Sequence, residues 1–506
     1  ETDCTFCRKI AAITKSKKIR FAVRLFPKRL IIKSLQFPFV FFRRFHQLFQ
    51  LCNAFFISGP VDDYRDFLNL SAIVFVSGQQ RLDLAVVDDA PLLQVDQQLA
   101  AVHAEALLHG MEALLELTGA KKAVFAFKGK YHDARARIEP LLSGNPRMAL
   151  HVLPNIYPAG DEQVLVYEAL RRIVPEGGIP MAVETVVLNV ETLLNVERAL
   201  SGTPVTEKYL TVCGAVREPR TLRVPIGVPF SAVVAACGGV TEPDAAFIEG
   251  GPMMGKPLPS WEKPVTKTTK GLLVLPRDHR LVVSKERSMK EMLRLARTAC
   301  CHCMLCTELC PRYLLGHSLH PDKLMRLASF NSTCERDASA TEAFLCCECG
   351  MCEVACVMGL QPWRLNRELK GRMASAGIKN PHANRPAAAH PFRELRTFSA
   401  ARLLHRLGLA PYAKRAPLDE GPSFKFQSVS RPQSVTLMLK QHIGAPSVPL
   451  VAVGDRVERE QLVARGEGPV SANLHSPISG VVAGLEKDRI LIRAEGANVE
   501  ERGNVT

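Results

Sequence analysis

The sequence predicts a multidomain α/β protein, and three observations support that fold class. Strands and helices alternate through residues 82–206. Short strands punctuated by Gly and Pro occupy residues 207–256 and 433–497. Two similar runs of cysteines lie between these β-rich parts, in residues 291–365. A chain of 506 residues, 47% of them hydrophobic, is long and apolar enough for several domains that each bury a core.

Residues 1–81 form an atypical basic and aromatic segment. The first fifty residues carry +10 of the chain's net charge of +15, and Pro27 and Pro38 interrupt any long helix. We therefore expect this segment to be poorly ordered; the alternative is a peripheral membrane-surface anchor. No apolar run reaches the roughly 18 residues of a membrane span. The rest of the chain has no basic stripe, so we expect no nucleic-acid partner.

The α/β pattern begins at residue 82. Residues 82–89 predict a strand, and residues 97–119 an amphipathic helix that ends at Gly119. A second strand is predicted at 123–129, followed by a helix at 133–142.

The pattern then continues with a strand at 149–158 and a helix at 161–174, which has acidic residues in its first turn. A strand, a turn and a helix follow within 185–200. Strands that alternate with helices favour a mostly parallel sheet.

Three further segments complete the chain. Residues 207–256 predict a compact β-rich module with one helix. Residues 375–432 are rich in Pro, Arg and Ala and predict a linker with one helix. Residues 433–497 are again β-rich.

The cysteine runs indicate iron–sulfur clusters. Each has the pattern C-x2-C-x2-C-x3-C, which is the bacterial ferredoxin spacing for [4Fe–4S] clusters. The second run repeats the first at an offset of 46 residues, which indicates a duplicated half. In order along the chain, the cysteines of the two runs are Cys300, Cys303, Cys306, Cys310, Cys346, Cys349, Cys352 and Cys356.

The fourth cysteine of such a run ligates the other cluster. We therefore assign the first cluster to Cys300, Cys303, Cys306 and Cys356. We assign the second cluster to Cys346, Cys349, Cys352 and Cys310. The alternative is zinc, which favours two CxxC pairs separated by a longer loop. Cys301 and Cys347 follow the first ligand of each run and are expected to be packing residues.

Residues 82–206 resemble the flavin domain of the NADH-binding flavoprotein subunit of respiratory complex I. The motifs that carry this resemblance are "YPAGDEQVL" (157–165), "PEGGIP" (175–180) and "NVETL" (189–193). Residues 207–256 resemble a β-grasp domain of the SLBB type, through "TVCGAV", "VPIGVPF" and "GGPMMG". Residues 433–497 resemble the barrel-sandwich domain of RnfC proteins, through "QHIGAP", "VGDRV" and "HSPISGVV".

The order of these modules resembles the cobalamin reductases of propanediol-utilisation microcompartments, which are relatives of the RnfC proteins of Rnf electron transport complexes. The resemblance implies an oxidoreductase that passes electrons from NADH, through FMN and two [4Fe–4S] clusters, to a corrinoid or protein acceptor. An adenosyltransferase or other members of a complex would be its partners. It also implies a cytoplasmic protein inside a bacterial microcompartment. The alternative is a non-catalytic relay protein of an Rnf-type complex at the cytoplasmic face of the inner membrane.

The chain departs from this family at the flavin site. Nothing in residues 1–81 matches the family's glycine-rich loop, whose backbone N–H groups approach the flavin phosphate. Ala85 and Ala90 stand where the family motif has Asn and Glu. The resemblance leaves three flavin-binding candidates, for which the alternative is capping of a helix N-terminus: Asn189, Glu191 and Thr192. No catalytic residue is assigned.

Four residues outside these motifs need separate comment. His302, His317 and His320 lie near the cysteines and are expected to support the clusters from nearby rather than bind iron, since ferredoxin-type sites use four cysteines. In the barrel-sandwich domain, Glu460 replaces a glycine that is usual in the family, so we expect a strained turn there. No Lys occupies the hairpin tip where swinging-arm domains carry their cofactor, so this domain is expected to serve docking or scaffolding.

Overall fold

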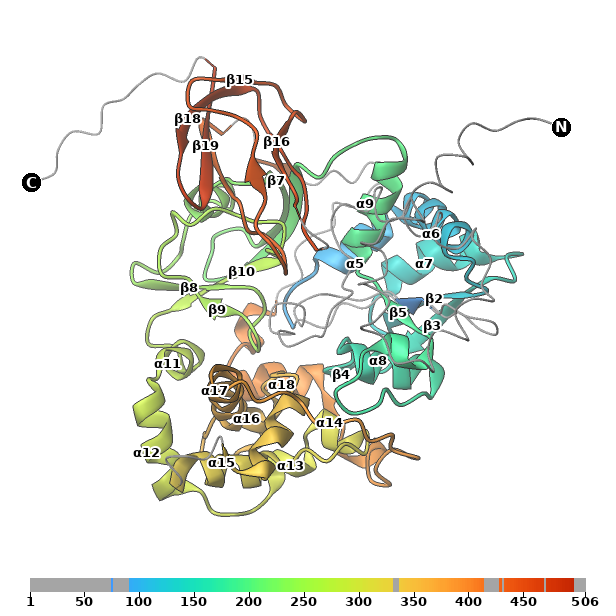
Figure 1. Cartoon of the computed structure of the whole chain (residues 1–506), viewed down its shortest axis with the longest axis vertical. Helices are drawn as coiled ribbons and strands as arrows, with labels where there is room; N and C mark the ends of the chain where they lie inside the picture. The colour runs from blue at the N-terminus through green and yellow to red at the C-terminus, as the bar shows by residue number, and fades with distance from the viewer. Residues whose placement is uncertain are drawn as a thin grey trace, which may run out of the picture. The chain divides into compact units, whose positions relative to one another are not determined.

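The computed structural model describes residues 74–75, 91–330, 336–413, 427–429, 432–467 and 470–495 (Figure 1). The strand predicted at 82–89 and most of the atypical segment lie outside these residues. Within the described ranges, no helix combines the length and the apolar character needed to cross a bilayer.

The first domain is built on a four-stranded sheet of order β3-β2-β1-β5. The strands are β1 (Val74–Phe75), β2 (Ala123–Lys128), β3 (Met148–Leu153) and β5 (Val186–Val187). Only β2 and β3 are parallel, because β1 pairs antiparallel with both β2 and β5. The prediction of a mostly parallel sheet is therefore wrong for this domain. β1 also shows that the atypical segment contributes a strand to the fold.

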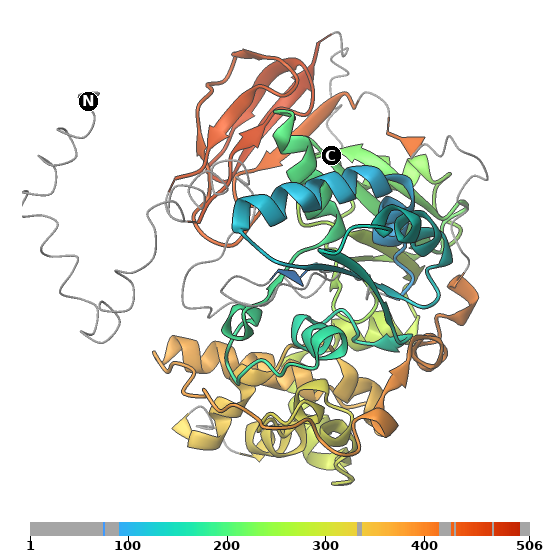
Figure 2. The same ribbon diagram turned by 90° about the vertical axis from the view of Figure 1, so that its right-hand side faces the viewer.

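The helices of this domain mostly follow the predicted pattern (Figure 2). The long helix predicted before Gly119 is two helices, α5 (Val95–Val102) and α6 (Ala104–Thr118), because the backbone leaves helical values at His103. Gly119 ends α6 in the left-handed conformation, with φ of 71°. α7 (His132–Leu142) packs against α5 and α6.

Two further helices begin at polar caps that lie at the candidate site. α8 (Glu162–Leu170) starts at Asp161, whose Oδ1 accepts the backbone N–H groups of Gln163 and Val164, both at 3.2 Å. α9 (Val190–Leu200) starts at Asn189. The short strand β4 (Ile156–Tyr157) is separated from β3 by Pro154, so the single strand predicted at 149–158 is two.

The β-grasp domain is a six-stranded sheet of order β12-β7-β6-β10-β8-β9, with α10 (Phe230–Ala236) beside it. Its central strand β10 pairs parallel with β6 and antiparallel with β8. The sheet therefore continues past residue 256. Its strands are β6 (Glu207–Gly214), β7 (Arg220–Pro225), β8 (Ala245–Glu249), β9 (Lys256–Pro257), β10 (Gly271–Pro276) and β12 (Gln427–Ser428).

The barrel-sandwich domain consists of two sheets of order β13-β19-β18-β15 and β14-β16-β17. Its core is continuous with that of the β-grasp domain, since Leu210 and Leu272 belong to the same buried cluster as Val435 and Ile490. Its strands are β13 (Ser434–Met438), β14 (Val448–Pro449), β15 (Arg456–Val457), β16 (Leu462–Arg465), β17 (Leu474–His475), β18 (Gly480–Leu485) and β19 (Arg489–Ala494).

The cysteine runs lie in a helical domain. Its helices have four to 14 residues, and α15 lies between the two runs. They are α11 (Arg280–Glu286), α12 (Met289–Ala299), α13 (Leu305–Glu308), α14 (Pro311–Leu314), α15 (Pro321–Phe330), α16 (Met351–Ala355) and α17 (Pro362–Ser375).

The segment predicted as a linker, 375–432, pairs with strands of both the α/β and the β-grasp domain. Its strand β11 (Phe398–Ser399) pairs antiparallel with β4, and α18 (Ala400–Leu407) follows directly. Near its end, β12 pairs with β7. It therefore ties domains together rather than merely spacing them.

Glu460 has φ of 70°, in the left-handed region that favours glycine. Its N–H donates to the Ser476 carbonyl at 2.7 Å, so the turn is fixed by the sheet. We predict that Glu460→Gly raises the free energy of unfolding by about 1 kcal/mol, because the Cβ clash is removed. The midpoint of urea unfolding measures this.

The matched control is Glu458→Gly, two residues earlier at a position without positive φ. It should lower the midpoint, since glycine there only adds freedom to the unfolded chain. Equal losses of stability in the two variants would contradict a strained turn.

Candidate functional site

The two cysteine runs adopt the same local backbone. In the first, left-handed residues occur at His302 (φ 58°) and Met304 (φ 61°), just before α13. In the second they occur at Glu348 (φ 59°) and Gly350 (φ 81°), just before α16. Both pairs stand two and four residues after the first cysteine, so the duplication seen in the sequence extends to the turns that aim the sulfurs.

The runs differ in exposure to solvent. In the first run Cys303 is exposed and Cys300 is half-buried. In the second run Cys349 and Cys352 are buried, as is Cys310 of the first run. The second candidate cluster is therefore the more enclosed.

The structure brings the fourth cysteine of each run close to the other run. Burial raises the pKa of the Cys306 thiol to about 12, and the nearby Asp322, Cys356 and Cys300 add to this rise. Burial likewise raises the pKa of Cys310, with Cys347 and Cys346 nearby.

A cysteine of the second run likewise has cysteines of both runs nearby. Burial raises the pKa of Cys352, and the sulfurs of Cys346 and Cys310 contribute. This arrangement supports the crossed ligand sets proposed from the spacing. Among the described residues, no three His, Cys, Asp or Glu side chains converge closely enough to hold one metal ion. The thiolates of a cube each bind a different iron, so they need not converge in that way.

A buried ionic group holds the turn of the second run. The Glu348 carboxylate, 2% exposed, pairs with Arg367 at 2.5 Å and with Lys370 at 3.0 Å. Lys370 Nζ also donates to the Cys346 carbonyl at 2.6 Å, and the N–H of Glu348 donates to Cys346 Sγ at 3.4 Å. Backbone N–H donors to sulfur are typical of iron–sulfur sites and stabilise thiolate charge.

The α/β domain contacts the second run directly. Tyr157 Oη donates to the Cys349 carbonyl at 2.9 Å. Arg312, two residues after Cys310, pairs with Asp161 at 2.8 Å. Both partners belong to the "YPAGDEQVL" motif, so this motif connects the flavin domain to the cysteines.

The three histidines near the clusters lie in different surroundings. His317 is buried, its Nε2 lies 3.0 Å from the Val174 carbonyl, and burial lowers its pKa to about 4. His320 lies 3.0 Å from Glu342, and His302 lies 3.2 Å from Arg326. His317 thus joins the cysteine domain to the α/β domain as a neutral side chain.

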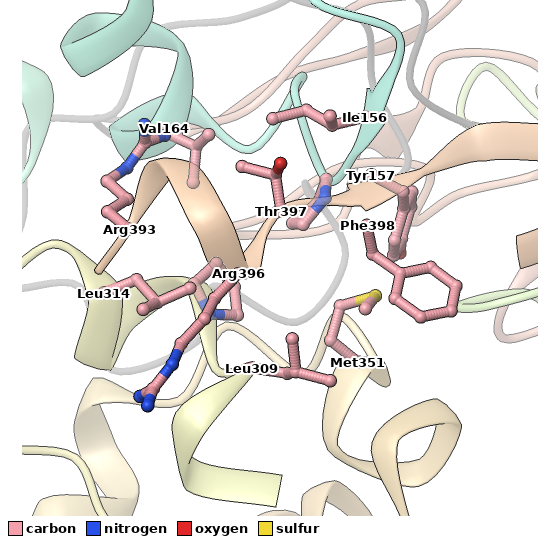
Figure 3. A pocket seen from close by; sticks show the side chains of 12 residues that line it. Ile156, Tyr157, Val164, Leu309, Leu314, Met351, Arg393, Arg396, Thr397 and Phe398 are labelled. Atoms are coloured by element: carbon pink, nitrogen blue, oxygen red, sulfur yellow. The ribbon is translucent and has the colours of Figure 1, made fainter. Parts of the chain in front are cut away.

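A small pocket of about 30 Å³ lies where β4 and β11 meet the cysteine domain (Figure 3). Figure 3 shows Leu309 and Met351, from the cysteine domain, with the ring of Phe398 from β11 beside Met351. The lining is mainly apolar, with two arginines and one threonine: Ile156, Tyr157, Pro158, Val164, Leu309, Pro311, Leu314, Met351, Arg393, Arg396, Thr397 and Phe398.

The flavin-binding candidates lie at the start of α9. Asn189 Oδ1 accepts the Glu191 N–H at 2.8 Å, which is the capping role named as the alternative. Asn189 Oδ1 also accepts from Lys270 Nζ at 3.0 Å. Thr192 is half-buried.

Glu191 belongs to a buried ionic network between α9 and the β-grasp sheet. Its carboxylate pairs with Lys208 and lies 3.7 Å from Lys270, which pairs with Asp96 at 2.5 Å. Burial would raise the pKa of Glu191, but Lys208 and Lys270 together lower it, so the carboxylate stays ionised. Burial lowers the pKa of Lys208, and Glu191 opposes this.

Sequence reasoning missed Asp96, Lys208 and Lys270 as partners of this site. The available signal was a lysine within or beside a strand that is otherwise apolar, in "EKYLTVCG" and "KGLLVLP". A buried lysine requires a carboxylate partner. The pattern does not say which carboxylate it will be.

Four family models match successive parts of the chain. The Nuo51 FMN-binding domain matches residues 85–198, and the SLBB domain matches 209–257. A 4Fe-4S dicluster domain matches 299–361, and the RnfC barrel sandwich hybrid domain matches 408–499. They confirm the predicted fold class and its four kinds of domain.

Cobalamin reductase PduS of Salmonella typhimurium is 40% identical over 456 residues, which cover 87% of this chain and 98% of the relative. The chain belongs to this family. The cobalamin reductase PduS of Citrobacter freundii is also 40% identical, over 82% of this chain and 90% of its own length.

Further matches cover smaller parts of the chain or are less similar in sequence. The C subunit of the Na⁺-translocating ferredoxin:NAD⁺ oxidoreductase complex of Acetobacterium woodii is 31% identical over 46% of this chain and 52% of its own. Among solved structures, an NAD⁺-reducing [NiFe]-hydrogenase matches with a TM-score of 0.36 at 18% identity, over 66% of this chain and 61% of that chain.

These matches confirm the prediction of an electron-transfer oxidoreductase with FMN and iron–sulfur clusters as its family's cofactors. The residues fit the clusters, since the sulfurs of the two runs lie near one another and a backbone N–H donates to Cys346. The match to the FMN-binding domain begins at residue 85. It does not include residues 1–81, in which the family's glycine-rich loop has no counterpart.

Cys301 is exposed, so the expectation that it is a packing residue is wrong, whereas Cys347 is buried. Cys303 is also exposed, and of Cys301 and Cys303 only Cys303 lies in the ligand register. We predict that Cys303→Ser loses one of the two clusters and weakens the second through their shared folding. Cys301→Ser, the matched control, should keep both. Iron content and low-temperature EPR of anaerobically purified variants measure this, and equal losses in both variants would contradict the ligand assignment.

The ionic network gives a second prediction. Lys270→Met should lower the free energy of unfolding by about 3–5 kcal/mol, because it leaves Asp96 charged and buried. The control is Lys263→Met, which breaks a pair with Glu249 in which the lysine is 43% exposed and should change stability by less than about 1 kcal/mol. Comparable urea midpoints for the two variants would show that the network contributes little.

Proposed function

We propose that this protein reduces a corrinoid, as the name cobalamin reductase of its PduS relatives suggests, and that its electrons come from NADH, as the resemblance of its flavin domain to complex I implies. The observation that carries the proposal is the direct contact of the flavin-domain motif with the cysteine domain, through the hydrogen bond from Tyr157 to the Cys349 carbonyl and the ion pair of Asp161 with Arg312. A bound flavin would accept the two-electron hydride and release single electrons, which the cobalt and the clusters require.

The ligands proposed for the first cluster are Cys300, Cys303, Cys306 and Cys356. Those proposed for the second are Cys346, Cys349, Cys352 and Cys310. Support comes from the spacing, the crossed neighbourhood of Cys310 and Cys356, and the repeated left-handed turns.

The different solvent exposure of the two cysteine runs suggests a direction of electron transfer. The second run adjoins the flavin domain and is buried, with Cys349 8% exposed. The first run reaches the surface at Cys303, next to Met304, which is 44% exposed. We infer that electrons enter at the second run and leave at the first, where an acceptor can approach.

The proposed flavin contacts of Asn189, Glu191 and Thr192 are limited by the ionic network. The polar atoms of Asn189 and the carboxylate of Glu191 are already bound to lysines and backbone. Together with the missing glycine-rich loop, this leaves few groups to cradle a phosphate.

We therefore predict that the chain binds FMN weakly. After gel filtration, the protein should retain much less than one FMN per chain, measured by the flavin absorbance of the denatured supernatant. Replacing residues 1–73 with a glycine-rich family segment, which keeps β1 in the sheet, should restore binding. Stoichiometric FMN in the unmodified chain would contradict this prediction.

The test of function is anaerobic reduction of cob(III)alamin by NADH in the presence of added FMN, followed by absorbance. The proposal expects reduction that requires the protein and is largely lost in Cys303→Ser. The alternative is a relay protein within a complex, for which the similarity to the Rnf-type relative from Acetobacterium woodii is the supporting observation. It predicts clusters that dithionite reduces but NADH does not, even with FMN.

The proposed partners are an adenosyltransferase or other members of a complex. The proposed location is a bacterial microcompartment, as for the family. Peripheral attachment to the inner membrane is the alternative. Co-purification from a native host, with and without the microcompartment shell, would separate the two locations.

A further inference from the structure

Arg312 is a buried cation two residues after Cys310. Its side chain is 8% exposed, and its Nη2 donates to Asp161 Oδ2 at 2.8 Å. Its Nε and Nη1 are buried without a hydrogen-bond partner among the described residues. Leaving such donors unpaired is costly, so they indicate acceptors other than the nitrogen and oxygen atoms of the described residues.

The second cysteine run lies beside these donors. The guanidinium interacts most strongly with the sulfur of Cys347, which is outside the ligand register, and also with that of the proposed ligand Cys349. Burial would lower the pKa of Arg312, but Asp161 and Cys347 raise it above its usual value, so the side chain stays charged. Asp161, in the flavin domain, thus fixes the position of the Arg312 guanidinium. The remaining N–H groups of Arg312 are available to the sulfurs of the cysteine domain.

Asn366, on α17, is a second buried side chain whose polar atoms lack a hydrogen-bond partner. Its side chain is 0% exposed, and neither its Nδ2 nor its Oδ1 has a hydrogen-bond partner among the described residues. Its amide lies next to the Cys346 sulfur. Two orphan donors from different helices therefore meet the sulfurs of one run.

The first cysteine run has no such donors in the part of the chain that the structure describes. Further buried side-chain atoms without partners among the described residues belong to Gln98, Arg135, Gln163 and His442, which lie outside the cysteine domain. The nearby cation Arg326 is 40% exposed and already paired with Asp322 at 2.9 Å.

We propose that Arg312 and Asn366 donate N–H groups to the sulfurs of the second cluster and raise its reduction potential. The inference rests on the cluster assignment proposed above and adds two residues that tune it. Reduction adds one electron to a cluster that is already anionic, and burial opposes that added charge. Donors and a positive charge at the sulfurs favour the reduced form, since cluster potentials depend on net charge and on hydrogen bonds to sulfur.

The test is an EPR-monitored potentiometric titration of the anaerobic full-length chain at one pH. Arg312→Gln and Asn366→Leu should each lower the midpoint of the same one of the two clusters. The expected shift is about tenfold in the one-electron reduction equilibrium, or about 59 mV. Arg312→Lys, which keeps the charge but loses the fork of donors, should recover part of the shift.

The matched control is Arg326→Gln, which removes a partly exposed cation near His302 and should leave that midpoint unchanged. Should Arg312→Gln fail to assemble its cluster, Asn366→Leu still decides the outcome. Two intact clusters with unmoved midpoints in both variants would overturn this inference alone. Native protein without [4Fe–4S] signals would overturn the cluster assignment and this inference with it.

Discussion

The interaction on which the cysteine domain would depend is the proposed crossing of each run's fourth cysteine to the cluster of the other run. The helices α13, α14 and α16 of this domain have only four or five residues, which is far too short to be stable by themselves. Cys310 lies among the cysteines of the second run and Cys356 near those of the first. Two cubes bound in this crossed way would clamp both halves together, so folding of the domain and cluster assembly would be one process.

The rest of the molecule positions this domain against the flavin domain. The Tyr157–Cys349 hydrogen bond, the Arg312–Asp161 ion pair and the β4–β11 pairing all act on one short stretch of chain, 155–161. A second junction, the Asp96–Lys270–Glu191 network, fixes the start of α9 to the β-grasp sheet. Residues near the candidate flavin site therefore also hold domains together, so substitutions there affect stability as well as binding.

The sequence was most informative where the chemistry of a site fixes the spacing of its residues along the chain. The cysteine pattern, the order of domains and the helix starts at Asp161 and Asn189 were all readable from it, because each depends on residues close together in the chain. What could not be predicted depends on contacts between distant segments. β1 joins the sheet of the α/β domain from the basic and aromatic segment, and β10 extends the β-grasp sheet past residue 256. Lys208 and Lys270 pair with carboxylates on other elements. Arg312 and Asn366 likewise give no local signal, since burial alone makes their N–H groups significant.

The central claim is that these eight cysteines hold two [4Fe–4S] clusters, and the most direct measurement is the content of iron, acid-labile sulfide and zinc in anaerobically purified protein. The account predicts about eight iron and eight sulfide per chain, from two cubes of four each. About one zinc per cysteine run with no sulfide would contradict it, and the electron path through the two runs would then have no carrier.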